Sequence, residues 1–200
     1  MASASIGWEL AQDHELVARV KAGENDFFEE IVRRYQRQIG NFIYRMIGDY
    51  ETALDLTQEV FIKIYASLDR YKFEYKFSTW IFKIASNTAI DHLRKQTVLI
   101  RSLSQTTADM EEVELQLPDR AASPEQALAK RERREQIEWV IAKLPPHYRE
   151  LIVLRHVNDL SYDEIAEVTG LPLGTVKNRI FRAREAMRKQ LQRLGIEGLD

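Results

Sequence analysis

Glycine and proline are distributed unevenly along the 200-residue chain, and this distribution limits the folds open to it more than any other feature. No glycine occurs between Gly48 and Gly170, and all five prolines lie between Pro118 and Pro172. Hairpins depend on such turn formers, so the first half of the chain is expected to form helices rather than paired strands. Apolar residues there recur at helical steps of three and four. The longest such series is Phe28, Ile31, Val32, Tyr35, Ile39, Phe42, Ile43 and Met46.

The apolar periodicity is lost between residues 101 and 129, where six acids, two arginines and two prolines occur among serines and threonines. This composition is typical of a linker between domains. We therefore expect an all-α protein, with two small helical bundles joined by a flexible acidic linker. The predicted boundaries are residues 10–97 for the first bundle, 98–123 for the linker and 124–195 for the second bundle.

A helix-turn-helix is predicted in the second bundle. Ser161 followed by Glu164 has the form of a capping box, which starts a helix. Gly170 can adopt the left-handed conformation that ends this helix, and Pro172 suits the first turn of the next one. A short helix, a turn with glycine and a longer helix form the motif. Ala166 and Gly170 are expected to let the two helices approach closely.

The second helix of this motif is strongly basic. Residues 175–193, TVKNRIFRAREAMRKQLQR, hold seven cations and one carboxylate, whereas the whole chain has 29 cations and 31 acids. At about 100° per residue, Val176, Ile180, Ala183 and Met187 form the buried stripe. An outward phenylalanine, Phe181, is difficult to explain as core but suits contact with a thymine methyl in a major groove. The alternatives are a solvated cationic helix and a helix that pairs with the acidic linker.

Aromatic residues cluster in the first bundle. Seven lie between residues 65 and 82, and in YKFEYKF, residues 71–77, aromatic and charged residues alternate. A single short strand would have no partner, so we expect a loop between helices. Rings interleaved with cations suit the stacking and charge neutralisation that single-stranded nucleic acid requires. Alternatively the rings form the core of a small bundle, and Phe77 and Trp80 fit either interpretation.

Composition excludes several classes of protein. There is no cysteine, so neither a disulfide framework nor a thiolate metal site is possible. No apolar run approaches the ~18 residues of a membrane span, and residues 1–20 carry acids where a signal peptide would be apolar. The four histidines lack ligand-like spacing, and Asp55 with Glu59 is a weak metal signal without a third ligand. We expect no cofactor, no membrane insertion and a cytoplasmic location.

Three segments in order carry a family resemblance: DLTQEVFIKIY, then FSTWIFKIASNTAIDHLRK, then LPPHYRELIVLRHVNDLSYDEIAEVTGLPLGTVKNRIFRAREAMRKQL. Over residues 10–193 the chain resembles bacterial RNA polymerase sigma factors of the extracytoplasmic-function (ECF) type, in the sigma-70 family. These keep the second and fourth conserved regions. The resemblance implies a non-enzymatic transcription initiation factor that binds core polymerase and promoter DNA. It also implies an anti-sigma factor as a partner and association with the nucleoid when the chain is bound to polymerase.

The resemblance also implies roles for individual positions. Asp55, Gln58 and Glu59 resemble the surface that binds the clamp of the largest polymerase subunit, and the second bundle is expected to contact the flap of the second-largest subunit. The linker resembles the segment that threads toward the active-site channel. Residues resembling those that melt and read the −10 element are Phe73, Phe77, Trp80, Lys83, Asn87 and Arg94. Residues resembling those that bind the −35 element are Arg155, Tyr162, Thr175, Lys177, Asn178, Phe181, Arg182 and Arg184, with Arg155 and Tyr162 expected on phosphates.

Two other interpretations are weighed against this one. A free-standing helix-turn-helix regulator would require a dimer on a palindromic site, and the sequence shows no sustained heptad that could form a dimer seam. A nucleic-acid-processing enzyme built on Asp55 and Glu59 would need magnesium held by a third acidic ligand, or a nucleophile with its base. The sequence shows neither a third ligand nor such a pair.

Overall fold

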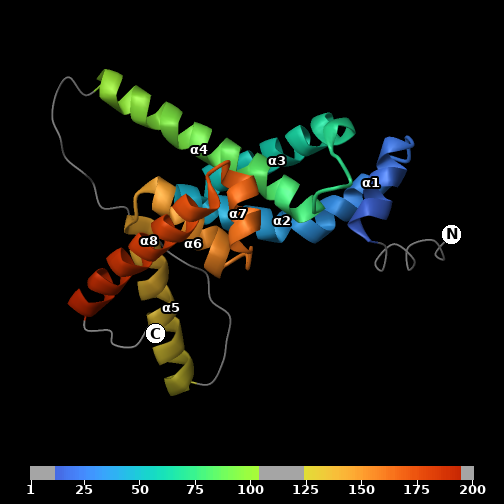
Figure 1. Ribbon diagram of the computed structural model, residues 1–200. Helices are drawn as coiled ribbons and strands as arrows, with labels where there is room; N and C mark the ends of the chain where they lie inside the picture. Colours follow the sequence, from blue (N-terminus) through green and yellow to red (C-terminus); the bar gives the residue numbers. More distant parts are fainter. Residues whose placement is uncertain (1–11, 104–123, 195–200) are drawn as a thin grey trace.

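The computed structural model describes residues 12–103 and 124–194 (Figure 1). In these two ranges every regular element is helical: eight α-helices and a short 3-10 turn, Leu68–Arg70. The all-α prediction is confirmed. None of the described helices is long and apolar enough to cross a membrane. In chain order the helices are α1 (Asp13–Lys21), α2 (Asp26–Ile47), α3 (Tyr50–Ser67), α4 (Phe77–Leu103), α5 (Pro124–Lys143), α6 (Pro146–His156), α7 (Tyr162–Thr169) and α8 (Leu173–Arg193).

The first bundle consists of α1 to α4, with α2 packed against each of the other three. Gly48 ends α2 with a φ of 88°, a left-handed conformation that a side chain would strain. Asp49 then caps α3 by accepting a hydrogen bond from the backbone N–H of Thr52 at 2.7 Å. The apolar stripe predicted for α2 forms its buried face, since Ile31, Tyr35, Ile39, Phe42, Ile43 and Met46 are all buried.

The predicted boundary between the first bundle and the linker differs from the end of α4. This helix continues to Leu103, six residues beyond the predicted end at residue 97. Most of the predicted linker, residues 104–123, lies outside the described residues. The division of the chain at residues 97 and 124 therefore stays a prediction.

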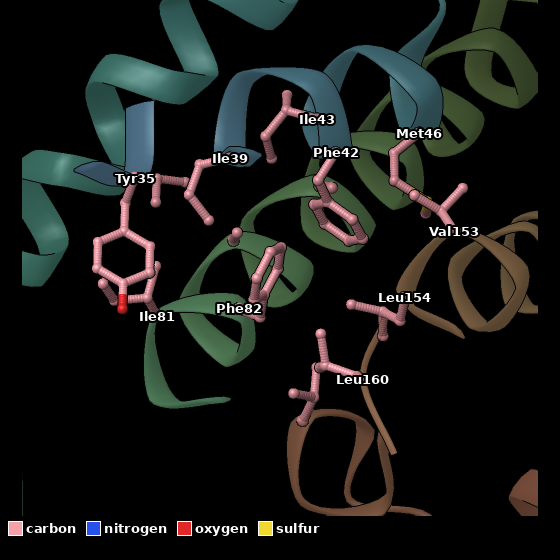
Figure 2. Packing of buried hydrophobic residues seen from close by; sticks show 14 of the residues in the cluster. Tyr35, Ile39, Phe42, Ile43, Met46, Ile81, Phe82, Val153, Leu154 and Leu160 are labelled. Atoms are coloured by element: carbon pink, nitrogen blue, oxygen red, sulfur yellow. The ribbon is translucent and has the colours of Figure 1, made fainter. Parts of the chain in front are cut away.

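The two bundles are packed against each other through apolar side chains. α7 lies against α4, and α6 lies against both α2 and α4 (Figure 1). Figure 2 shows Val153, Leu154 and Leu160 of the second bundle facing Met46, Phe42 and Phe82 of the first. All six side chains are buried and belong to one continuous cluster. The sequence did not predict this contact, because each bundle's periodicity shows only that a face is buried and not what covers it.

Among the described residues, polar contacts also join the bundles around this apolar centre. Arg45 of α2 makes a two-pronged ion pair with Glu138 of α5, with its closest N–O distance at 2.5 Å. Arg149 of α6 donates to the carbonyl oxygen of Met46 at 2.6 Å. At the edge of the interface the Lys76 ammonium lies 2.8 Å from the Glu164 carboxylate, and within it the Ser86 hydroxyl donates to the Glu150 carboxylate.

Glu150 is a buried carboxyl with an altered pKa. Burial raises its pKa above the ordinary value of 4.5, and the hydrogen bond from Ser86 and the charge of Arg179 oppose that shift only partly. An acid with a raised pKa binds its proton more readily in the folded chain than in the unfolded chain. Above the ordinary pKa, ionisation therefore costs more in the folded state, and this group lowers stability as the pH rises.

We predict that Glu150→Gln removes this loss of stability with rising pH. The variant keeps an acceptor oxygen for Ser86 but cannot ionise, so its unfolding free energy relative to the wild type should increase between about pH 4 and about pH 7. Urea denaturation at several pH values measures the difference. The exposed Glu167→Gln on α7 is the control and should follow the wild-type profile. Parallel profiles for Glu150→Gln and the wild type would contradict the assignment.

Candidate nucleic-acid interface

The helix-turn-helix formed by α7 and α8 has the caps that the sequence predicts. The Ser161 hydroxyl accepts from the backbone N–H of Glu164 at 3.2 Å, and the Glu164 carboxylate accepts from the backbone N–H of Ser161 at 2.7 Å. Gly170 ends α7 with a φ of 69°. Its role is this conformation rather than close packing, since a Cβ placed at Gly170 would meet no atom within 4 Å. The expectation that Gly170 lets the two helices approach is therefore wrong.

α8 presents a buried face and a charged outward face. Val176, Ile180 and Ala183 are buried as predicted, together with Leu191, while Met187 is partly buried at the edge of the core. Phe181 is 65% exposed, which is unusual for so large an apolar side chain. The exposed polar residues beside it are Lys177, Asn178, Arg182 and Arg184. The outward face therefore combines an apolar ring with donors that can reach base edges.

Arg188 differs from the cations at the start of α8. It lies six residues beyond Arg182 and donates to Glu185 at 2.7 Å within the same helix. Such an exposed pair contributes little to stability. It does tie the Arg188 guanidinium to Glu185 of the same helix.

An open hollow of about 530 Å³ lies beside the first turns of α8. Thr175, Asn178 and Arg182, which the sequence analysis selected, line one side of it. His147 and Tyr148 from the start of α6 also line it, as does Arg179 of α8. These last three residues were missed as site candidates, because Tyr148 fits the apolar pattern of α6 and His147 has no sequence partner. Their position shows that the α6 start belongs to the same concave surface.

Arg155 and Tyr162 are arranged differently from the expectation that both contact phosphates. The Arg155 guanidinium donates to the carbonyl oxygen of Leu160 at 2.9 Å and lies 5.1 Å from the centre of the Tyr162 ring. Both side chains are half-buried. Arg155 therefore holds the turn between α6 and α7 in place. Burial lowers the pKa of the neighbouring His156, and the charges of Arg184 and Arg155 lower it further.

The aromatic loop between the 3-10 turn and α4 divides into buried and exposed rings. Tyr71 and Phe77 are 2% exposed, whereas Phe73 and Tyr75 are 44% and 49% exposed. Residues 71–76 form a loop rather than a strand, as predicted, but the period-two alternation does not mark which rings face inward, because all four rings alternate with charged residues. Trp80 is half-buried and stacks on Phe77, with the ring centres 5.7 Å apart. Phe77 is core, and its assignment to the −10 surface is not retained because its ring faces are covered.

The polar face of α4 continues from this loop. Lys83, Asn87 and Arg94 are exposed on the side of the helix opposite the buried Phe82 and Ser86. Arg94 pairs with Asp91 at 2.8 Å. The exposed rings of the loop and these polar groups together form a surface with stacking faces and cations, which suits single-stranded nucleic acid.

α3 carries a third exposed surface. Asp55, Gln58 and Glu59 all point to solvent, and Glu59 pairs with Lys63 at 2.6 Å. Two apolar residues that the sequence analysis missed lie beside them, Leu54 at 50% exposure and Ile62 at 68%. The sequence could have indicated them, since neither of these apolar residues falls on the buried stripe of α3. Among the described residues, no group of three or more His, Asp or Glu could hold a metal ion.

Family comparisons match both bundles. The model of sigma-70 region 2 matches residues 31–98, and that of sigma-70 region 4 matches residues 134–187. The chain is 40% identical over 190 residues to the ECF RNA polymerase sigma factor SigW of Bacillus subtilis, covering 89% of this chain and 96% of the relative. It is 34% identical over 192 residues to the ECF RNA polymerase sigma-E factor of Escherichia coli K12, covering 93% and 97% of the two chains.

Solved structures show the same fold. The sigma factor RpoE of Bartonella quintana, solved in complex with the anti-sigma factor NepR, superposes with a TM-score of 0.66 at 21% identity, covering 82% of this chain and 96% of that chain. CnrH, solved in complex with the cytosolic domain of CnrY, gives a TM-score of 0.64 at 23% identity, covering 90% and 97%.

Proposed function

This chain belongs to the ECF RNA polymerase sigma factors of the sigma-70 family, and we propose that its three surfaces described above have separate functions. As a sigma factor it is a transcription initiation factor that binds core RNA polymerase and directs it to promoters. The observation that carries the assignment of tasks is the exposed outward face of α8 on a helix-turn-helix, combined with a second cationic surface carrying exposed rings in the first bundle. A free-standing regulator would require only the first of these.

The −35 element is assigned to α8. Lys177, Asn178, Phe181 and Arg182 lie on its outward face, where a helix in a major groove reads base edges. Thr175 and Arg184 flank this face, and the hollow beside it adds His147, Tyr148 and Arg179 as candidates for backbone contact. Arg155 and Tyr162 support the turn before α7, so we assign them a positioning role and phosphate contact only at the edge.

The −10 element is assigned to the loop 71–76 and the polar face of α4. Phe73 and Tyr75 have exposed rings that can stack on unpaired bases, and Trp80 presents one side beside them. Lys83, Asn87 and Arg94 are placed to meet the phosphates and edges of the separated strand. A flipped base costs a few kcal/mol to unstack, and such a surface offsets that cost.

Core polymerase is assigned to α3. The combination of Asp55, Gln58 and Glu59 with exposed Leu54 and Ile62 fits a partner surface that is basic at its edge and apolar at its centre. We assign this partner to the clamp of the largest subunit. In the second bundle, the exposed Trp139, with Lys143 at 5.3 Å from its ring centre, is the candidate contact for the flap of the second-largest subunit.

An anti-sigma factor is proposed as a regulatory partner. The support is that RpoE and CnrH, which share this fold, were each solved with a protein partner, and that of RpoE is an anti-sigma factor. We also infer that the chain acts in the cytoplasm and is nucleoid-associated when polymerase carries it to promoters. Both inferences follow from the proposed function.

The surface on α3 gives the first test. Asp55→Ala with Glu59→Ala, and separately Ile62→Ala, should each weaken binding to core polymerase by about tenfold or more, because exposed side chains at the centre of an interface dominate its affinity. Fluorescence titration with core enzyme measures the effect. Glu15→Ala with Glu29→Ala removes the same charge from another surface and is the control. Unchanged core affinity with normal helicity would remove the assignment.

The recognition helix gives the second test. Arg182→Ala should cost about 1–3 kcal/mol and relax the preference at one −35 position, because Arg182 is placed to reach a base edge. Arg188→Ala should weaken all sequences alike and lower the salt slope by about one unit, if the side chain contacts DNA. Holoenzyme binding to a library randomised at −35 separates the two effects. Equal, sequence-independent losses would mean that α8 contacts the backbone alone.

A further inference from the structure

We propose that Lys21 and His14 of α1 are positioning residues that hold the loop 71–76 in the shape that receives unpaired promoter bases. This proposal rests on the function assigned above to the loop. α1 precedes residue 31, where the region 2 match begins, so the comparisons assign no task to it. A helix as short as α1 is not stable alone, and it is held by burying Leu16, Val17 and Val20.

Lys21 fixes the start of the loop. Its ammonium donates to the carbonyl oxygen of Asp69 at 3.2 Å and to that of Tyr71 at 2.8 Å, and it lies 5.2 Å from the centre of the Phe73 ring. One charged group thus holds two backbone carbonyls and one of the exposed rings. Because a charged donor forms stronger hydrogen bonds than a neutral one, this contact constrains the loop more than an amide would.

His14 fixes the ring that closes the loop. The Tyr71 hydroxyl donates to the carbonyl oxygen of Tyr75 at 2.5 Å, and His14 Nε2 lies 2.9 Å from the same hydroxyl. A hydroxyl has one proton, so the contact with His14 requires Nε2–H as the donor. The His14 ring also meets Phe73 edge to face, with the centres 5.5 Å apart. The loop backbone is therefore fixed from inside while Phe73 and Tyr75 keep exposed faces.

The test uses holoenzymes with Lys21→Met, which keeps the aliphatic stem, and His14→Phe, which keeps the ring. Each should lower the rate of promoter opening roughly tenfold, the effect of losing about one hydrogen bond. Each should also weaken binding of a single-stranded −10 oligonucleotide, while core affinity stays within error of the wild type. Lys21→Arg should restore much of the opening rate. Arg19→Met removes a cation from α1 that does not contact the loop, and is the control.

Permanganate reactivity of thymines near −10 reports opening directly. Normal opening and oligonucleotide binding by both variants would overturn the positioning role. Phe73→Ala and Trp80→Ala, measured in parallel, show which proposal has failed. If those two variants also open promoters normally, the function assigned to the loop is wrong. If they open slowly while Lys21→Met and His14→Phe do not, only the role of α1 is wrong.

Discussion

The burial of one shared apolar cluster between α2, α4 and the second bundle determines the arrangement of everything else. Phe42 of α2 and Phe82 of α4 lie against Leu154 and Leu160, so the inner face of α4 contacts both α2 and the second bundle (Figure 2). Since a helix with one buried face must turn the opposite face to solvent, this packing orients Lys83 and Asn87 outward. Ser86 and Glu150 make this centre partly polar. Because the buried Glu150 carboxyl costs free energy when it ionises, the two bundles are held together less tightly than an entirely apolar interface would hold them.

The surfaces assigned to DNA are supported by rigid elements rather than by the exposed side chains themselves. The capping box at Ser161 and the left-handed Gly170 fix the angle at which α8 leaves the turn, and Arg155 holds the preceding turn through the carbonyl oxygen of Leu160. In the first bundle Tyr71 plays the corresponding part, because its buried ring and hydroxyl anchor a loop whose neighbouring rings are exposed. Groups held in place before binding lose less conformational freedom when they meet a ligand, so such support contributes to affinity without any contact with DNA.

Local features were predictable from the sequence, and contacts between distant segments were not. Ser161, Gly170 and the buried stripe of α8 follow from rules that connect residues three or four apart, and the structure confirms them. The sequence could not separate Phe77 from Phe73, because both alternate with charged residues and only the packing of Tyr71 and Trp80 decides which ring is covered. The contact of Arg155 with a carbonyl oxygen five residues away in a turn was not predictable either, and its expected phosphate contact stays a prediction. The pairing of Arg45 with Glu138 joins residues 93 positions apart, a relation that periodicity does not contain.

The chain is close to neutral overall, and at the Lys76–Glu164 pair opposite charges from the two bundles meet. Lys76 belongs to the loop assigned to the −10 element, and Glu164 belongs to the capping box of the helix-turn-helix. Their contact lowers the pKa of Glu164 and raises that of Lys76, which keeps both groups charged. As an exposed pair it adds little to the stability of the interface. Its consequence lies in the partner each group has: while the bundles are packed, a lysine of one DNA surface is neutralised by an acid of the other.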